Sequence, residues 1–501
     1  MENQQPDYDH NTMKKFIVIV LLTITYSCFL TVTGQKSDSI RIFSGTYLGN
    51  FQRNYYGNEA PDRLDTIWRI YLGEGISPAY GNPEKLWKGA GWTGQPLVTE
   101  ENGKTYLIQG AFDYHLKKID AETGEICWQY RFDDILKGTG TIWENNYTTN
   151  PDERYVILQG SRRGVNNKIN SEHCYSFRGI SYRSGKELWR MNVKQTESYS
   201  RDVDGSALTL GDTGYLALEN GLFTIFSPDF RKGHKTNNIV EPLIYKEITY
   251  YKNTDTKIHG GNIESESSPC YLDGRIYTTS GSGRVYGYNM KSGKVDWIFE
   301  IGADLDGSPV VTSDSCLLIP VEKQYIPGRG GVFKLDPSKD PDHAVVWFFP
   351  TGDRDWFHWE GGIIGSVAVN DVYTTDTTHQ IAAFIGVDGY LYVVNHRQID
   401  STFTATGPDN MQHYPVPELL YKHYIGGTIS TPIIVKNKLI APLDIGLYLY
   451  EFDGDFNFTL LDKVENIQID ATPVVHNKRL YVASTNGYLY CFGDRKQIAV
   501  K

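Results

Sequence analysis

Residues 283–299, GRVYGYNMKSGKVDWIF, decide how this chain folds. Two runs that alternate aromatic or apolar residues with small or polar ones flank a short polar turn that ends in Gly293. Alternation with a period of two is typical of β-strands, and a Gly-containing turn between two such runs indicates a hairpin. The pattern recurs at 116–128, LKKIDAETGEICW, and at 181–189, SYRSGKELW. The chain is therefore built from repeats of a hairpin whose second strand carries a tryptophan.

Two further strands precede this hairpin in each repeat. The first opens on Ser-Pro or Thr-Pro, as at Ser268, Ser308 and Thr472, and proline is tolerated at the start of a strand. An apolar strand follows it, so that one repeat is four short antiparallel strands. The outermost strands recur about every 50–60 residues, apart from one long and one short interval. They centre on Trp68, Trp128, Trp189, Tyr245, Trp297, Trp347, Tyr421 and Leu461.

This count predicts an all-β fold, an eight-bladed β-propeller of four-stranded antiparallel blades. The last repeat has three strands, between Ile469 and Phe492, whereas 65–73 is a lone strand of the outermost type near the N-terminus. If the N-terminal strand pairs with the C-terminal blade, the ring closes and two exposed sheet edges disappear. Seven blades is the alternative, because the third and seventh repeats lack the tryptophan.

The composition agrees with a strand-rich fold. The 501 residues include 49 Gly, 35 Tyr, 21 Phe and 10 Trp, and 22% are charged. Helical bundles, coiled coils and disordered chains need an Ala/Glu/Lys/Leu bias or a larger excess of charge. The formal net charge of −11 leaves no basic stripe to neutralise phosphates, so we expect no nucleic-acid partner.

The N-terminal residues are expected to form a targeting segment. A pair of lysines after Met13 precedes a long apolar run, and small residues precede Gln35, which is the order of a secretory signal peptide with Met13 as the true start. A membrane anchor and lipidation at Cys28 are the alternatives. We expect an exported monomer, periplasmic or secreted, with no transmembrane segment after cleavage. Its expected parts are a signal peptide (1–34), an N-terminal extension (35–64), a single β-propeller domain (65–493) and a C-terminal tail (494–501).

Residues 120–128, DAETGEICW, together with the Ser-Pro and Gly-aromatic strands, resemble the PQQ-like repeat. This repeat occurs in quinoprotein alcohol dehydrogenase-like propellers and in non-catalytic, BamB-like propellers of the bacterial envelope. The resemblance covers roughly residues 50–493. It implies that a glycine makes a tight turn between the outer strands and that a tryptophan docks onto the neighbouring blade. These blade-docking residues are Gly124, Gly185 and Gly293 with Trp128, Trp189 and Trp297, and Trp68 and Trp347 occupy outer strands of the same type.

The resemblance also implies what a catalytic member would need. Such members hold the quinone at the channel mouth with a vicinal cysteine pair, a tryptophan floor and a Glu/Asn/Asp set on calcium. This chain has no adjacent cysteines and no haem-attachment motif. We therefore expect no cofactor and no catalytic residues, and a PQQ- and calcium-dependent dehydrogenase remains the alternative.

Four carboxylates are candidates for a ligand site at the channel mouth. Each stands two residues before the small polar residue of an innermost strand, so the period of two points them the same way. They are Asp204, Glu266, Asp306 and Asp470. Together they would form a negatively charged mouth for a cation or a basic peptide. Alternatively, each caps a local turn. Whether they hold a metal is left open.

A second candidate site is the loop 353–362, DRDWFHWEGG, the densest cluster of aromatic and acidic residues in the chain. Its ligand-binding candidates are Trp356, His358, Trp359 and Glu360. Paired tryptophans beside His and Glu suit stacking on a sugar ring or a general acid/base pair. A packed corner between blades is the alternative. Trp87 and Trp92 are predicted to lie on a similar loop opposite.

These patterns favour a non-catalytic scaffold that binds an envelope protein or a glycan through its loop faces. The repeats are intact while the catalytic markers of the resembling enzymes are missing. The alternative is an enzyme on the same ring, either a quinone (PQQ)-dependent dehydrogenase or a carbohydrate-active enzyme that uses His358 and its neighbours.

Overall fold

The computed structural model describes residues 39–79 and 82–495. The predicted signal peptide (1–34), its start at Met13 and the Cys28 anchor lie outside the described residues, as does most of the predicted tail. No helix among the described residues is long and apolar enough to cross a membrane. The residues from Arg41 onward belong to one compact unit.

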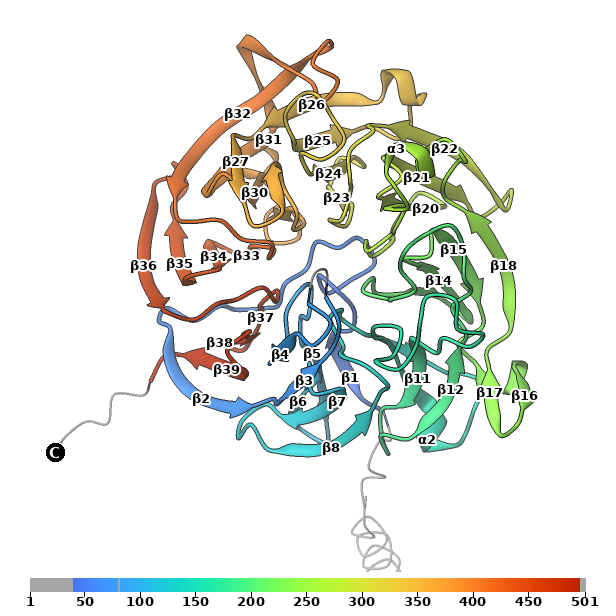
Figure 1. The fold of residues 1–501 in the computed structure, drawn as a ribbon. Coiled ribbons are helices and arrows are strands. Elements are labelled where there is room, and N and C mark those ends of the chain that lie inside the picture. Colours follow the sequence, from blue (N-terminus) through green and yellow to red (C-terminus); the bar gives the residue numbers. More distant parts are fainter. Residues whose placement is uncertain (1–38, 80–81, 496–501) are drawn as a thin grey trace, which may run out of the picture. The chain divides into compact units, whose positions relative to one another are not determined.

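Eight antiparallel sheets, seven of four strands and one of five, follow one another around a ring (Figure 1), which confirms the eight-bladed propeller and excludes the seven-bladed alternative. Blade 1 contains β5 (Leu97–Glu101), β6 (Lys104–Gly110), β7 (His115–Asp120) and β8 (Ile126–Arg131), and blade 2 contains β9 (Thr141–Glu144), β10 (Tyr155–Gly160), β11 (Phe177–Ser181) and β12 (Glu187–Met191). Blade 3 contains β13 (Leu208–Leu210), β14 (Thr213–Ala217), β15 (Leu222–Phe226) and β18 (Ile244–Thr249), and blade 4 contains β19 (Cys270–Leu272), β20 (Arg275–Ser280), β21 (Arg284–Asn289) and β22 (Lys294–Glu300). Blade 5 contains β23 (Val310–Val311), β24 (Leu317–Val321), β25 (Gly331–Leu335) and β26 (Val345–Pro350), and blade 6 contains β29 (Ala368–Val369), β30 (Ile381–Ile385), β31 (Tyr390–Thr406) and β32 (His413–Tyr424). Blade 7 contains β33 (Ile433–Val435), β34 (Lys438–Leu443), β35 (Gly446–Phe452) and β36 (Phe458–Glu465), and blade 8 contains β37 (Val474–His476), β38 (Arg479–Ala483), β39 (Tyr488–Gly493) and β2 (Asp65–Tyr71).

Three short hairpins leave the ring. They are β3 (Glu74–Ile76) with β4 (Leu86–Lys88), β16 (His234–Thr236) with β17 (Ile239–Glu241), and β27 (Asp353–Trp356) with β28 (Trp359–Gly361). The helices among the described residues are single turns, α2 (Pro151–Arg154) and α3 (Asp255–Ile258), with 3₁₀ turns η1 (Phe230–Lys232), η2 (Pro341–His343) and η3 (Thr377–His379).

The ring closes as predicted, by pairing of the N-terminal strand β2 with the last strand β39. The register runs from Asp65 opposite Gly493 to Tyr71 opposite Tyr488. All eight predicted outer positions lie in outer strands, including Tyr245 in β18 and Leu461 in β36, where the tryptophan is missing. One feature differs from a uniform set of blades: β1 (Arg41–Ser44) pairs with β5 and gives blade 1 a fifth strand.

Tryptophans on five of the eight outer strands each connect their own blade to the next by a hydrogen bond. The indole N–H of Trp128 donates to the carbonyl oxygen of Tyr182 at 3.1 Å. Gly185 follows in the same turn, where φ is +67° and a Cβ atom would lie 2.8 Å from the Trp128 ring. Both its backbone conformation and this close approach require glycine. The same bond to the next blade is made by Trp68, Trp189, Trp297 and Trp347.

Gly124 repeats this arrangement against the ring of Trp68, with φ of +79°. Gly293 differs, because the outer strand facing it carries Tyr245 instead of tryptophan, and a Cβ there would meet only the Tyr288 hydroxyl, at 3.7 Å. At that position φ of +65° alone favours glycine.

A belt of hydroxyl groups joins the inner strands around the channel. The backbone N–H of Ser206 donates to Ser268 Oγ at 2.9 Å, and that of Ser268 donates to Ser308 Oγ at 2.8 Å. The bonds continue from Ser308 to Ser366 Oγ and from Ser366 to Thr431 Oγ1. Because each bond crosses from one blade to the next, the small polar residue of the repeat holds blades 3 to 7 in register.

Candidate functional site

The channel is closed at one end by the chain between β1 and β2, which crosses the centre of the ring in Figure 1. This plug, residues 45–58, forms hydrogen bonds with blades 4 to 8 in turn. Its partners there are Tyr271, Val311, Val369, Thr431 and Val475. Thr431 belongs to the Ser/Thr belt, and the other four partners follow the small polar residue of their inner strand. The plug therefore lies at the end of the channel opposite the predicted acids, which precede these small polar residues.

Arg53 lies at the middle of the plug, has no exposed surface and adopts φ of +62°. Its guanidinium donates to the carbonyl oxygens of Pro269, at 2.7 Å, and Tyr47, at 2.8 Å, and to Thr46 Oγ1, at 2.7 Å. Burial lowers the pKa of Arg53 to about 10, so the group is still cationic at neutral pH.

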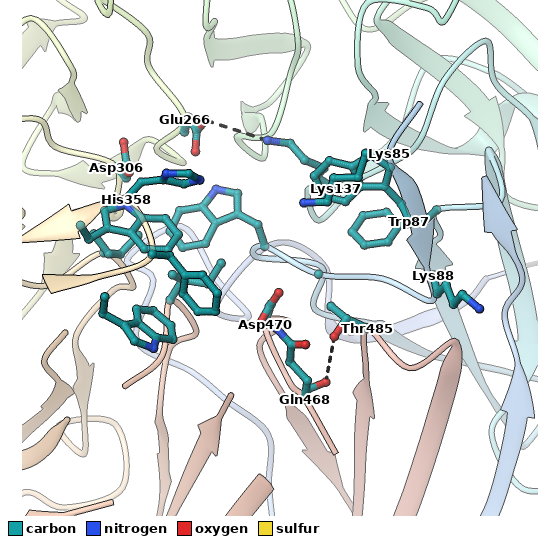
Figure 2. A pocket seen from close by; sticks show the side chains of 18 of the residues that line it. Lys85, Trp87, Lys88, Lys137, Glu266, Asp306, His358, Gln468, Asp470 and Thr485 are labelled. Atoms are coloured by element: carbon teal, nitrogen blue, oxygen red, sulfur yellow. Dashed lines mark hydrogen bonds and ion pairs between the residues drawn. The ribbon is translucent and has the colours of Figure 1, made fainter. Parts of the chain in front are cut away.

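The other end of the channel opens into a pocket of about 560 Å³ (Figure 2). Both predicted sites contribute to it, although the sequence analysis treated the channel acids and the loop cluster as two separate sites. Three of the four channel acids line it, namely Glu266, Asp306 and Asp470, together with Trp356, His358 and Trp359 of the loop cluster, and Trp87 and Trp92. Glu360 is exposed on β28 and lies outside this lining, and Asp204 is buried behind it.

Two hairpins supply the aromatic walls. In β27–β28, Trp356 pairs with Trp359 across the strands, and their rings stack with centroids 5.6 Å apart. Phe357 makes the turn between them, with φ of +54°. In β3–β4, Trp87 packs edge to face on Phe112, with centroids 5.4 Å apart, and its indole N–H donates to Ser77 at 2.8 Å. These contacts fix two apolar surfaces at the pocket.

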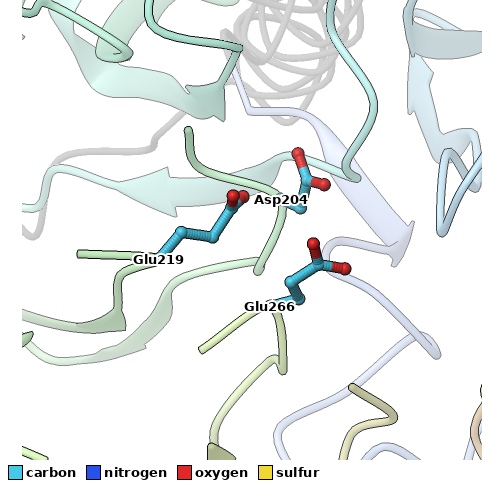
Figure 3. A group of neighbouring side chains, drawn as sticks. All are labelled: Asp204, Glu219 and Glu266. Carbon is cyan, nitrogen blue, oxygen red and sulfur yellow. The ribbon is translucent and has the colours of Figure 1, made fainter. Parts of the chain in front are cut away.

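A first group of carboxylates lies behind the pocket. Asp204, Glu219 and Glu266 point toward one another in Figure 3, and a carboxylate oxygen of each lies within 4.8 Å of the others. Lys137 forms ion pairs with Asp204 and, at 4.0 Å, with Glu266. Burial raises the pKa of Asp204 to about 7 despite Lys137, and burial together with the neighbouring acids raises that of Glu219 well above its usual value.

A second group, Asp304, Asp306 and Glu322, has carboxylate oxygens equally close together. The side-chain amide of Asn262 donates to Asp304 Oδ2 at 2.5 Å. Burial, and then the neighbouring acids, raise the pKa of Asp306 and Glu322 well above their usual values. Among the described residues no lysine, arginine or histidine forms an ion pair with any of the three.

Several of these residues carry no sequence signal. Lys137 follows β8, Glu219 lies between β14 and β15, and Glu322 follows β24, so none of them occupies a repeated position. Asp304 is the exception: it stands two residues before Asp306, and the same period of two that selected Asp306 would have found it.

Comparisons with known proteins agree with the propeller fold. A family model described as "Outer membrane protein assembly factor BamB" matches residues 176–338. That region spans the repeats that hold Trp189, Trp297 and both carboxylate groups. The chain carries a PQQ-like repeat β-propeller. A search of curated proteins finds no match.

Two solved structures share the fold of this propeller. The crystal structure of BamB from Moraxella catarrhalis is 14% identical, with a TM-score of 0.51 over 86% of this chain and 100% of that one. The quinohemoprotein alcohol dehydrogenase from Comamonas testosteroni is 11% identical, with a TM-score of 0.54 over 91% of this chain and 81% of that one. At these identities the likeness is one of fold.

The residues of the pocket differ in how well they fit the groups that such enzymes use. Carboxylate oxygens in two close sets are the ligands that calcium prefers. A PQQ quinone, which is itself a carboxylic acid, would meet Glu266, Asp306 and Asp470. The described cysteines are all free, and none is adjacent to another. The side of the pocket that holds Glu266 and Asp306 therefore suits a cation better than an anionic quinone, whereas Lys85 and Lys88 line the other side.

Proposed function

We propose that this propeller is an exported, non-catalytic scaffold that binds a glycan in the pocket opposite the plug. The observation that carries the proposal is a cavity of about 560 Å³ walled by the stacked pair Trp356 and Trp359 and by Trp87, with carboxylates at its floor. Sugar rings present a C–H face that packs on aromatic rings and hydroxyls that donate to carboxylates. This volume is within the range of small-ligand pockets.

The surroundings of His358 favour binding over acid/base chemistry. Its ring lies edge-on to Trp359, with centroids 6.2 Å apart, and forms no hydrogen bond with any described residue. A general base is usually oriented by a third group and lies within hydrogen-bond reach of its partner. The pocket supplies stacking surfaces and acceptors, which are sufficient for recognition.

Export is supported by the N-terminal sequence and by the family description. A lysine pair, an apolar run and small residues before Gln35 have the order of a signal peptide. The matching family is described as an outer membrane assembly factor, which is consistent with a location in the envelope. The N-terminal mass of the mature protein tests this: a start far from Gln35 contradicts cleavage there.

Calorimetric titration with cello- and chito-oligosaccharides of two to six rings tests the binding. We expect saturable binding to the wild type and at least a tenfold loss in Trp359→Ala, because stacking area at the pocket disappears. The control is Tyr147→Ala, which removes an exposed ring on blade 2, outside the pocket. If no oligosaccharide binds, while envelope proteins are captured equally by wild type and Trp359→Ala, the glycan proposal fails.

A quinone-dependent dehydrogenase is the second candidate, favoured by the two carboxylate groups that suit calcium. Reconstitution with PQQ and calcium, followed by a dye-reduction assay on alcohols and sugars, tests it. Quinone-dependent turnover would overturn the non-catalytic proposal. Release of new reducing ends from the oligosaccharides would instead indicate a carbohydrate-active enzyme.

A further inference from the structure

Negative charge is distributed unevenly around the pocket. Asp306 faces Asp304, Glu264, Glu266 and Glu322, all of them acids. Glu266 shares Lys137 with the buried Asp204. In the described part of the chain, no cation forms an ion pair with Asp306 itself. This side of the pocket therefore has more carboxylates than counter-charges, and burial makes that excess costly.

The opposite side of the pocket is compensated by lysines. Lys85 lies close enough to Asp470 to lower the pKa of that carboxyl group, against burial and Asp444, which raise it. Lys85 Nζ also stands 3.8 Å from the centroid of Trp87, and Lys88, which lines the same rim, pairs with Glu74 at 3.2 Å. A ligand that carried positive charge along its whole length would be repelled here. The complementary ligand has one cationic edge and is otherwise neutral.

We propose that the glycan bound by this pocket is an amino sugar, whose ammonium group is held by Asp306 and Glu266 while its ring packs between the aromatic walls. The inference rests on the glycan-binding function proposed above and names the class of glycan. Tryptophan faces beside the carboxylates add to the attraction, because cations bind favourably over aromatic rings. An ammonium group supplies three donors and a full charge in a compact volume, which suits carboxylates converging from two blades.

The protonation of the acids provides a separate signature of this mode of binding. Burial, with the surrounding acids, raises the pKa of Asp306 well above its usual value and also raises that of Glu266, although Lys137 opposes the shift in Glu266. Without a ligand, Asp306 therefore keeps its proton to a higher pH than an ordinary carboxyl group does. An arriving ammonium favours the carboxylate form, so binding should release protons to the solvent, whereas a neutral sugar should release none.

The test compares oligosaccharides of equal length by calorimetry at pH 5.5, where the amine of glucosamine is cationic. The probes are a tetramer of one glucosamine and three N-acetylglucosamine rings, called the glucosamine tetramer below, its fully N-acetylated counterpart and cellotetraose. Each is titrated in two buffers of different ionisation enthalpy so that released protons are counted. We expect the glucosamine tetramer to bind at least tenfold more tightly than both neutral tetramers, with net proton release.

Variants test whether Asp306 produces the preference for the glucosamine tetramer. Asp306→Asn should lower the affinity for the glucosamine tetramer at least tenfold, and Asp306→Glu should restore the preference over the neutral tetramers. The matched control is Asp273→Asn, which makes the same charge change in an exposed turn at the plug end of blade 4 and should have no effect. If Asp306→Asn does not fold, proton release by the wild type still decides the matter.

The outcomes separate this inference from the function on which it rests. Equal binding of all three tetramers overturns the amino-sugar assignment and leaves glycan binding intact. Binding by none of them overturns both. Tetralysine binding as tightly as the glucosamine tetramer also overturns the assignment, because a polycation should be repelled by Lys85 and Lys88.

Discussion

The two ends of the channel are built from the same inner strands but differ in whether their buried charged groups have partners within the protein. At the plug end a single buried cation, Arg53, is surrounded by carbonyl and hydroxyl oxygens, and its donors are used within the protein. At the pocket end several carboxylates gather around one lysine, Lys137, and Asp306 has no ion-pair partner among the described residues. The charged group at the plug end has its hydrogen-bond partners within the protein, whereas Asp306 at the pocket end has no cationic partner among the described residues.

The difference suggests that the plug end of the strands contributes to stability and the pocket end to ligand binding, a division that the predictions below test. Interactions that are complete in the free protein contribute to folding, and incomplete ones leave free energy for a ligand. The plug end should therefore be sensitive in stability and insensitive in binding, and the pocket end should show the reverse. Each prediction below tests one side of this division.

The largest effect is expected from Arg53→Ala. The change leaves the buried carbonyl oxygens of Pro269 and Tyr47 without donors and creates a cavity, so we expect a loss of about 3–5 kcal/mol in the free energy of unfolding. Denaturant unfolding measures it, with the exposed Arg63→Ala of the same segment as the control. A loss below about 1 kcal/mol would mean that the plug is not a structural element.

The next largest effect is a loss of oligosaccharide affinity when Trp87, the aromatic wall opposite Trp359, is removed. Trp87→Ala should lower oligosaccharide affinity by about 1.5–2 kcal/mol, or ten- to thirty-fold, because it removes one stacking surface. Trp87→Phe keeps an aromatic face and should cost less than threefold. Calorimetry gives the affinity and a thermal melt gives the stability. If both variants bind oligosaccharides as tightly as the wild type does, ligands contact only the β27–β28 wall.

The fold was predictable because its determinants repeat. Each blade carries its own strand pattern, and most carry a docking tryptophan, so the repeats without one, such as those at Tyr245 and Leu461, could still be placed correctly from the spacing of the others. The lone strand at 65–73 was informative for a similar reason, since an unpaired edge needs a partner. The plug offered no such signal: its conformation depends on partners from many blades, and a single segment carries no period.

The site was predictable only in part, for the same physical reason. Glu266, Asp306 and Asp470 occupy a repeated position, so alignment of the repeats placed them at one end of the channel. Their meeting with Trp356 and Trp87 depends on how far each hairpin reaches over the ring, which neither hairpin sequence encodes. Lys137 and Glu322 come from turns that do not repeat, so the balance of charge around the pocket could not be predicted from the sequence.

A smaller effect is expected in the dependence of stability on pH. Burial, with Asp444, raises the pKa of Asp470 from 3.8 to about 6. Between these values the folded protein binds a proton that the unfolded chain has lost, so this carboxyl makes stability fall as pH rises from about 4 to 6. Asp470→Asn should therefore be more stable than the wild type by ~1–2 kcal/mol at pH 7.5 and equal to it near pH 4. A constant difference at both values would assign the effect to packing instead.

The smallest effect tests whether the lysines at the rim act only through long-range repulsion. Lys88 is nearly half exposed and already paired with Glu74, so solvent and salt screen it strongly. Lys88→Met should raise the affinity for the glucosamine tetramer, by less than threefold, and leave the neutral tetramers unaffected. The gain should vanish in about 1 M salt, where the screening length is about 3 Å. The control is Lys339→Met, an exposed lysine outside the pocket. A weaker affinity in Lys88→Met would show that this lysine contacts the ligand, and the open end of the channel would then recognise an anionic group as well as a cationic one.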